Sequence, residues 1–132
     1  MNQTSKDHFN AQLRERTLKM AANIRNMLVK LKVIAIDRTQ IQQLIRSASS
    51  VAANYRSATR GRSDAEYYSK ICIVVEEVDE TLFWLEYLIE INLIRKEENM
   101  TLLDEVNQLV RLFSTIKKKM KEKIDSMAGN QR

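Results

Sequence analysis

Acidic side chains gather in one short segment and are the first candidates for metal-assisted chemistry: Glu76, Glu77, Asp79 and Glu80. Carboxylates one helical turn apart can hold magnesium, as a nucleotide hydrolase would require. Such a hydrolase also needs an E-x-x-D pair one helix later, whereas the only later pair of that pattern, Glu122 and Asp125, lies near the chain end. An acidic helix face is more often solvated or ion-paired, so we expect no metal site.

The single histidine and the single cysteine give no support for catalysis. His8 lies in a polar N-terminal segment, with no Glu-x-x-His pair for a di-iron bundle and no second cysteine for zinc. Cys72 follows Ile71 and precedes three β-branched residues, so we expect a small buried hydrophobe that cannot form an internal disulfide. We therefore expect no catalytic residue, no cofactor and a reducing, cytoplasmic location.

Arginine side chains form a second group with chemical potential: Arg46, Arg56, Arg60 and Arg62. Spacings of seven, three and four residues place Arg46, Ala53, Arg56 and Arg60 close to one face of a helix. A guanidinium group suits phosphate because its planar fork donates two parallel hydrogen bonds. The alternative is that these arginines pair with the carboxylates of the acidic segment, and the sequence leaves both interpretations open.

A lysine cluster near the chain end is the third group: Lys117, Lys118, Lys119, Lys121 and Lys123. It surrounds the apolar Ile116, Met120 and Ile124, and the positive charge complements a helix C-terminus. The cluster is either a nucleic-acid contact or a solvated helix end. Aromatic residues that would stack on bases are missing from its sequence neighbourhood, so we expect contacts with phosphates.

Helices must position all three groups. The 132 residues include no proline and only two glycines, which removes the turn chemistry that a multi-stranded sheet needs. Apolar positions recur at steps of three and four, as in the stripe from Leu13 to Ile34 and in the stripe from Leu102 to Ile124. We expect one all-α domain over residues 1–132, an antiparallel up-down-up-down four-helix bundle with helices at about 8–35, 39–60, 63–93 and 100–126. No apolar run of about 18 residues is present, so we expect no membrane contact.

The link between the second and third helices has the clearest local signals. Ser63 and Glu66 have the spacing of a capping box, in which the Ser63 hydroxyl accepts from the Glu66 amide and the Glu66 carboxylate reaches back to the Ser63 amide. Gly61 is expected to be the left-handed stop of the second helix. Asp37 or Thr39 is expected to cap the start of that helix, with Gln42 as partner of Thr39.

Two helices have more apolar or small surface than one copy of the chain should bury. Residues 47–53 place small side chains on every face of the second helix, and residues 71–75 are apolar all round. Charge also divides between helices, because residues 38–62 have five cations and no carboxylate, whereas residues 63–94 have one cation and eight carboxylates. We infer a homo-oligomer, with interface candidates Ser50, Asn54, Tyr55, Glu77, Glu80 and Trp84. The alternative is a monomer whose loops and fourth helix cover both faces.

Three segments together resemble a known bacterial family. They are the S-V-x-A-N-Y segment at residues 50–55, the R-S-x-x-E-[FY] segment at residues 62–67 and the D-E-T-x-F-W-L segment at residues 79–85. The chain is similar to the four-helix-bundle proteins encoded in intervening sequences of 23S ribosomal RNA genes, which are related to the accessory variability determinant of diversity-generating retroelements. The resemblance implies a basic homopentamer, and it implies RNA or DNA and a reverse transcriptase as partners.

These observations lead to one function hypothesis and one alternative. We expect a non-enzymatic homo-oligomeric scaffold that binds nucleic-acid phosphates through Arg46, Arg56, Arg60 and Arg62, together with Lys117, Lys118, Lys119 and Lys121. The alternative is a protein-interaction module whose arginines serve the assembly interface and which binds no nucleic acid.

Overall fold

Four long α-helices make up most of the chain. The computed structural model describes residues 3–130, and within that range it has no β-strand. The helices are α1 (Gln3–Leu28), α2 (Arg38–Thr59), α3 (Asp64–Glu90) and α4 (Met100–Asn130). Short 3₁₀ turns, η1 (Ala35–Asp37) and η2 (Lys96–Glu98), precede α2 and α4. The expected all-α class with four helices is therefore confirmed. None of the helices between residues 3 and 130 combines the length and the apolar character that a membrane crossing requires.

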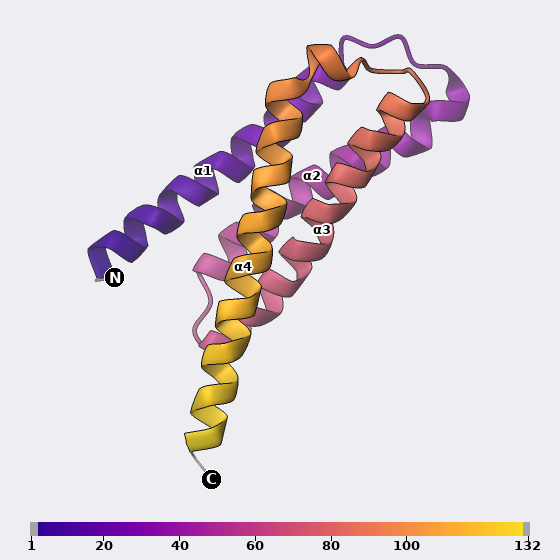
Figure 1. Ribbon diagram of the computed structural model, residues 1–132. Helices are drawn as coiled ribbons and strands as arrows, with labels where there is room; N and C mark the ends of the chain where they lie inside the picture. Colours follow the sequence, from indigo (N-terminus) through magenta and orange to yellow (C-terminus); the bar gives the residue numbers. More distant parts are fainter. Residues whose placement is uncertain (1–2, 131–132) are drawn as a thin grey trace.

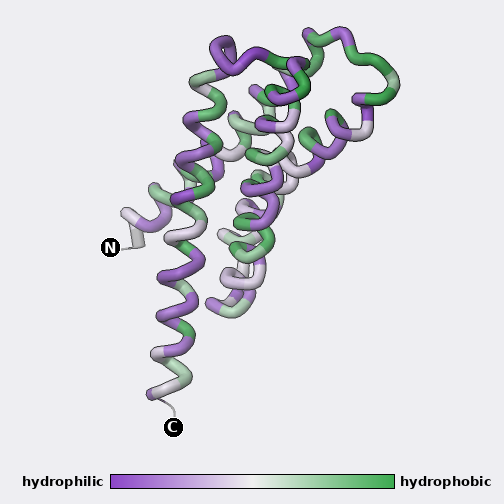
Figure 2. The backbone as a smooth tube through the Cα atoms, turned by 45° about the vertical axis from the view of Figure 1, so that its right-hand side comes forward, coloured by the Kyte–Doolittle hydropathy of each residue, from purple (hydrophilic) through white to green (hydrophobic). Residues whose placement is uncertain are grey.

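The helices lie side by side, with unequal packing between neighbours. The most extensive packing joins α2 to α3, followed by α3 to α4 and α1 to α2, while α1 and α4 touch over a short stretch. Figure 1 shows the reason, because α1 diverges from α4 toward its N-terminus and α4 continues past the ends of α2 and α3. The last turns of α4 are mostly hydrophilic, as the purple colour of Figure 2 shows. An arm of the lysine-bearing helix thus extends beyond the core.

The core draws large side chains from all four helices. Tyr55 and Phe113 lie at its centre with ring centroids 5.3 Å apart, and both side chains have no exposed surface. Most positions of the two apolar stripes expected from the sequence point inward, although Ile34 at the end of the first stripe is exposed. The largest side chains that are fully buried around this pair are Leu13, Met20, Ile24, Leu44, Ile71, Leu85, Leu88 and Leu109.

Small side chains allow α2 and α3 to approach closely. Ser47 and Ala48 of α2 are buried, and the Ser47 hydroxyl lies 3.0 Å from the hydroxyl of Thr81 on α3. Both hydroxyl groups also bond to carbonyl oxygens of their own helices, those of Leu44 and Glu77. A buried hydroxyl is costly unless it is hydrogen-bonded, and each of these two is satisfied within its own helix, so their contact marks the register in which α2 and α3 pack.

The first helix is shorter than the apolar stripe suggests. It ends at Leu28 and not near residue 35, and the chain then tightens through a hydrogen bond from the Leu31 amide to the Leu28 carbonyl. Leu31 still packs against the core, so the stripe continues across a turn that is no longer α-helical. Val29, Val33 and Ile34 are β-branched and weaken helix propensity at this point. Asp37 precedes α2 as its N-cap residue but makes no side-chain capping hydrogen bond.

The turn between α2 and α3 follows its sequence signals only in part. The Ser63 hydroxyl accepts from the Glu66 amide at 3.1 Å, as expected. The Glu66 carboxylate, however, accepts from the Arg62 amide at 2.6 Å and not from the Ser63 amide. Gly61 was expected in the left-handed region, and this is wrong because its φ is not positive. Glycine suits the close approach at this turn, since a Cβ there would lie 3.2 Å from the Ala58 carbonyl oxygen, and the turn would have to relax slightly.

The left-handed residue that the sequence did not indicate is Asn92, with φ of 60° after the end of α3. Its amide donates to the Ile89 carbonyl and the next amide, of Leu93, donates to the Leu88 carbonyl, both at 2.9 Å. This is the double hydrogen bond of a Schellman motif, in which asparagine replaces the usual glycine. It satisfies carbonyl groups that the helix end would otherwise leave without partners.

Replacing Ser63 by Ala should lower the free energy of unfolding by about 1 kcal/mol, because the N-cap hydrogen bond to Glu66 is lost. Urea unfolding monitored by circular dichroism measures the change. The matched control is Ser69→Ala, an exposed position within the same helix, which should stay within about 0.5 kcal/mol of the parent. Equal effects of the two substitutions would contradict the capping role.

Candidate nucleic-acid interface

Arg46 is occupied by the acidic helix of its own chain. Its guanidinium lies 3.2 Å from a carboxylate oxygen of Glu77 and 2.7 Å from one of Glu80. The Glu80 carboxylate also accepts a hydrogen bond from the Trp84 indole at 3.2 Å. Hydrogen bonding to Arg46 lowers the pKa of Glu80, and the bond to Glu80 raises the pKa of Arg46. For Arg46, the ion-paired alternative describes the structure better than a phosphate-binding role.

The acidic segment accordingly has the geometry of an ion-paired helix face. Glu77 and Glu80 turn toward Arg46, while Glu76 and Asp79 are exposed on other sides of α3. Over residues 3–130 no three histidine, cysteine or acidic side chains come together in a way that could hold a metal ion.

The interface candidates fall into different environments. Glu77, Glu80 and Trp84 belong to the Arg46 network on the α2–α3 surface. Asn54 is half-buried, and its amide donates to the Ser50 carbonyl at 3.0 Å and to the Ser50 hydroxyl at 2.9 Å, both within α2. The expectation that Tyr55 lies in an oligomer interface is wrong, because its side chain is 0% exposed and its hydroxyl donates to Asn10 at 3.2 Å. Tyr55 therefore offers no surface to a second copy.

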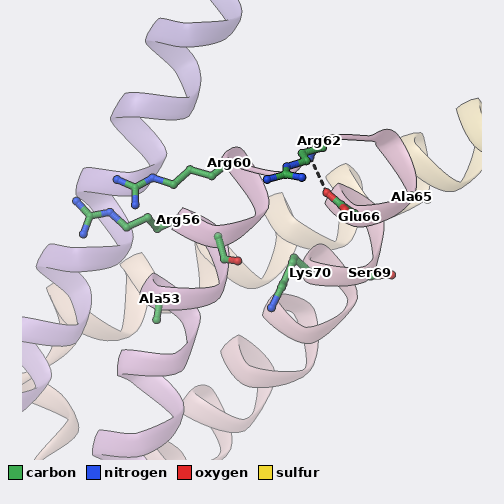
Figure 3. A pocket seen from close by; sticks show the side chains of 10 residues that line it. Ala53, Arg56, Arg60, Arg62, Ala65, Glu66, Ser69 and Lys70 are labelled. Carbon is green, nitrogen blue, oxygen red and sulfur yellow. Dashed lines mark hydrogen bonds between the residues drawn. The ribbon is translucent and has the colours of Figure 1, made fainter.

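The remaining three arginines lie around one cleft, which we call the turn cleft. It encloses about 700 Å³ between the last turns of α2 and the first turns of α3, and its charged lining residues are Arg56, Arg60, Arg62, Glu66 and Lys70. In Figure 3 the side chains of Arg56 and Arg60 project in the same direction from α2, away from Lys70 on α3. Gly61 and Ala53 complete the lining with little side-chain volume, which leaves the cationic groups accessible.

A second cavity, the end groove, lies on the other side of the same turn. It encloses about 450 Å³ between the N-terminal part of α1, the start of α3 and the C-terminal half of α4. Its charged lining residues are Lys6, Arg62, Asp64, Lys119 and Lys123, and Lys123 is paired with Asp64 at 3.3 Å. Arg62 lines both cavities, so together they form one continuous basic end of the molecule.

The net charge of the protein is concentrated at this basic end. Among residues 3–130, seven cationic side chains line the two cavities, against two carboxylates. That excess of five equals the formal net charge of the whole chain, and the rest of the chain has equal numbers of cations and carboxylates. The electrostatic attraction for a polyanion is therefore local.

The lysine cluster is divided by the helical repeat. Lys119 and Lys123 are one turn apart on the face of α4 that lines the end groove. Lys118 and Lys121 lie on other faces, and Lys121 is paired with Asp125 at 3.0 Å. Lys117 is half-buried and does not line the end groove. The structure thus joins only part of the cluster to Arg62.

Three of the residues that line these cavities were not singled out as site candidates from the sequence. Lys6 lies in the polar N-terminal segment that resembled a tail, and Lys70 is the single cation of the acidic helix, a signal that could have singled it out. Tyr67 lines the end groove beside the lysines although it is far from them in sequence. Burial raises the pKa of the Tyr67 phenol, so this aromatic ring stays neutral.

Comparison with known proteins supports a family assignment and gives no activity. The sequence model of the family described as 23S rRNA-intervening sequence protein matches residues 10–115, a range that includes the turn cleft and ends before the lysine cluster. The chain is similar to the crystal structure of a protein of unknown function from the S23 ribosomal protein family of Bacteroides thetaiotaomicron. The identity is 29%, the TM-score is 0.70, and the match covers 80% of this chain and 97% of that chain. Curated proteins give no match.

Replacing Arg46 by Gln should cost about 0.5 kcal/mol at neutral pH, since the pair with Glu80 is partly exposed. Glu80 has a pKa below its ordinary 4.5 in the folded chain, so its stabilisation is full above that value and is lost as the pH falls through the folded pKa. The difference between parent and variant should therefore shrink below pH 4.5. Urea unfolding across pH measures this, with the exposed Arg111→Gln as control. A difference that is independent of pH would contradict the pairing.

Proposed function

The chain belongs to the 23S rRNA-intervening sequence protein family, and we propose that it is a non-enzymatic scaffold or adaptor that binds nucleic acid at its basic end. The observation that carries this proposal is the concentration of the entire charge excess around the turn cleft and the end groove. Phosphate groups are the ligands that such a surface attracts, and the attraction is independent of base sequence.

The geometry of the turn cleft supports phosphate binding. Arg56 and Arg60 are exposed one helical turn apart, so their guanidinium groups can reach neighbouring phosphates of one strand. Both carboxylates at this end are already engaged, Glu66 with the Arg62 amide and Asp64 with Lys123. The arginines of the cleft therefore keep most of their positive potential toward solvent.

The scaffold that we propose is a cyclic homo-oligomer of up-down-up-down bundles, and the resemblance stated above implies five copies. Two exposed features support self-association. Phe83 on α3 is 55% exposed and packs edge-to-face on Trp84 at 4.8 Å. A shallow cavity between α1 and α2 is lined by Leu18 and the small residues Ser49, Ala52 and Ala53. A contact between such unlike surfaces is head-to-tail, and it gives a ring where the rotation between successive copies closes.

Assembly would strengthen a weak phosphate contact. Each added copy presents another basic end, and linked sites bind a polyanion with an avidity that exceeds the affinity of one site. The same assembly can hold a protein partner, and the resemblance stated above, which extends to the accessory determinant of retroelements, suggests a reverse transcriptase in that role.

A second candidate function is a protein-interaction module that binds no nucleic acid. The observation in its favour is the number of large apolar side chains that one chain leaves exposed, among them Leu18, Ile36 and Phe83. In this alternative the arginines of the turn cleft hold the assembly together, so removing them would dissociate the oligomer.

Replacing Arg56, Arg60 and Arg62 together by Gln should weaken binding to a labelled RNA or DNA of mixed sequence. Loss of three phosphate contacts should make the slope of log affinity against log salt shallower by about 2. Fluorescence anisotropy over a series of salt concentrations measures both quantities.

The matched control carries the same change of charge at the opposite end of the bundle. It replaces Lys30, Lys32 and Arg38 by Gln, all exposed and close to the connection between α1 and α2. Control binding should stay near that of the parent. If both triple variants lose the same affinity, the effect is one of net charge and the basic end has no special role. If the parent binds nothing while the cleft variant falls apart in sedimentation, the interaction-module alternative is correct.

Replacing Phe83 by Ser should shift the sedimenting particle from a multiple of the 15.4 kDa chain toward the single chain. The physical reason is that the apolar Phe83 side chain, exposed in one copy, is buried in the proposed assembly. The control is Ile36→Ser, at a side chain that is 76% exposed in the α1–α2 connection. Analytical ultracentrifugation decides the matter, and a parent protein that stays at single-chain mass at all concentrations would remove the oligomer from the proposal.

A further inference from the structure

The end groove differs in character from the turn cleft. Beside its cations it has an apolar wall made of Tyr67 on α3 together with Ile116 and Met120 on α4. Its volume of about 450 Å³ is in the range of small-molecule sites, which are concave, largely apolar and carry a few polar groups that orient the ligand. A surface that served only to attract a phosphate backbone would not need this wall.

The polar groups of the groove are held by the fold. Asn10 on α1 lines the groove while its amide oxygen accepts a hydrogen bond from the buried Tyr55 hydroxyl at 3.2 Å. Lys123 is held at the rim by Asp64 at 3.3 Å, and the backbone of Arg62, though not its exposed side chain, is fixed by the bond from its amide to Glu66. Groups anchored in this way lose little freedom when a ligand binds.

We propose that the end groove binds one unpaired nucleotide, with its base against Tyr67 and Met120 and its phosphate at Arg62 and Lys119. This inference rests on the proposed nucleic-acid function and specifies its ligand as single-stranded. Every base has a π-face that can stack on an aromatic ring, so the groove would accept bases of any type. The thioether of Met120 adds a polarizable contact to the same face.

The groove should therefore distinguish a single strand from a duplex. In a duplex the base is stacked and paired, and bringing it into a pocket costs the energy of unstacking and unpairing. The cations of the turn cleft attract both forms alike through phosphates. Preference for the single strand thus depends on the groove, whereas general affinity depends on the arginines.

The experiment compares a labelled single-stranded oligonucleotide with a hairpin duplex of equal phosphate number, by anisotropy on the full chain. Tyr67→Leu removes the ring and keeps an apolar side chain, and it should weaken single-strand binding about tenfold while leaving duplex binding unchanged. Tyr67→Phe keeps the ring and should bind the single strand like the parent. Circular dichroism melting of each variant confirms that the bundle is folded.

A second substitution, at Met120, tests the groove in case Tyr67→Leu unfolds the bundle. Met120→Ala should also reduce the preference for the single strand, whereas Met127→Ala, an exposed methionine further along α4 and outside the groove, should not. If Met120→Ala and Tyr67→Leu leave the ratio of single-strand to duplex affinity unchanged, the nucleotide site is overturned. The proposed function would survive that result as long as the arginine triple variant still loses binding.

Competition with a nucleoside monophosphate shows whether the end groove binds free nucleotides or only nucleotides within a strand. Displacement of the labelled single strand from the parent, with a weaker effect on Tyr67→Leu, supports a site that takes free nucleotides as well. A preserved single-strand preference without displacement supports a site for nucleotides within a strand. Equal displacement from both proteins, which would reflect competition for phosphate contacts alone, overturns a base-binding role.

Discussion

Ser47 on α2 and Thr81 on α3 touch through their hydroxyl groups, 3.0 Å apart and out of contact with water. Only small side chains allow two helices to come this close, and the contact between the two hydroxyls marks the register in which α2 and α3 pack. With α2 and α3 held together, the connection between them is a tight turn in which a Cβ at Gly61 would lie only 3.2 Å from the Ala58 carbonyl oxygen. The basic end is built around that turn.

The arginines of α2 have two separate tasks because of this register. Arg46, near the middle of α2, lies opposite Glu77 and Glu80 and is neutralised by them. Arg56 and Arg60 lie beyond the acidic part of α3 and line the same cleft as Lys70. Clustered like charges repel one another, and a bound polyanion relieves that repulsion. The same helix pair thus produces an ion-paired middle and an unneutralised end.

Sequence reasoning was successful where a signal is local. The capping bond of Ser63 and the buried faces of the helices follow from neighbours three or four positions apart. It failed where tertiary space decides: Gly61 serves a close approach and has no left-handed backbone, and Tyr55 belongs to the core of one chain. The end of α3 near Asn92 was expected, but the left-handed conformation of Asn92 was not. The candidate site was found in part, since Arg56, Arg60, Arg62 and Lys119 line cavities at the basic end, while Lys6, Lys70 and Tyr67 were missed.

The sequence by itself determined the helical class, the faces that become buried and the family resemblance, because period, composition and short motifs are properties of neighbouring residues. Only the tertiary structure decided which charges remain without a partner. Coulomb interactions depend on distance in space, and the packing of α4 against α3 brings Lys119 and Lys123 to Arg62 and Tyr67 across large separations in sequence. A groove with an aromatic wall and a cationic rim is therefore a property of the folded chain.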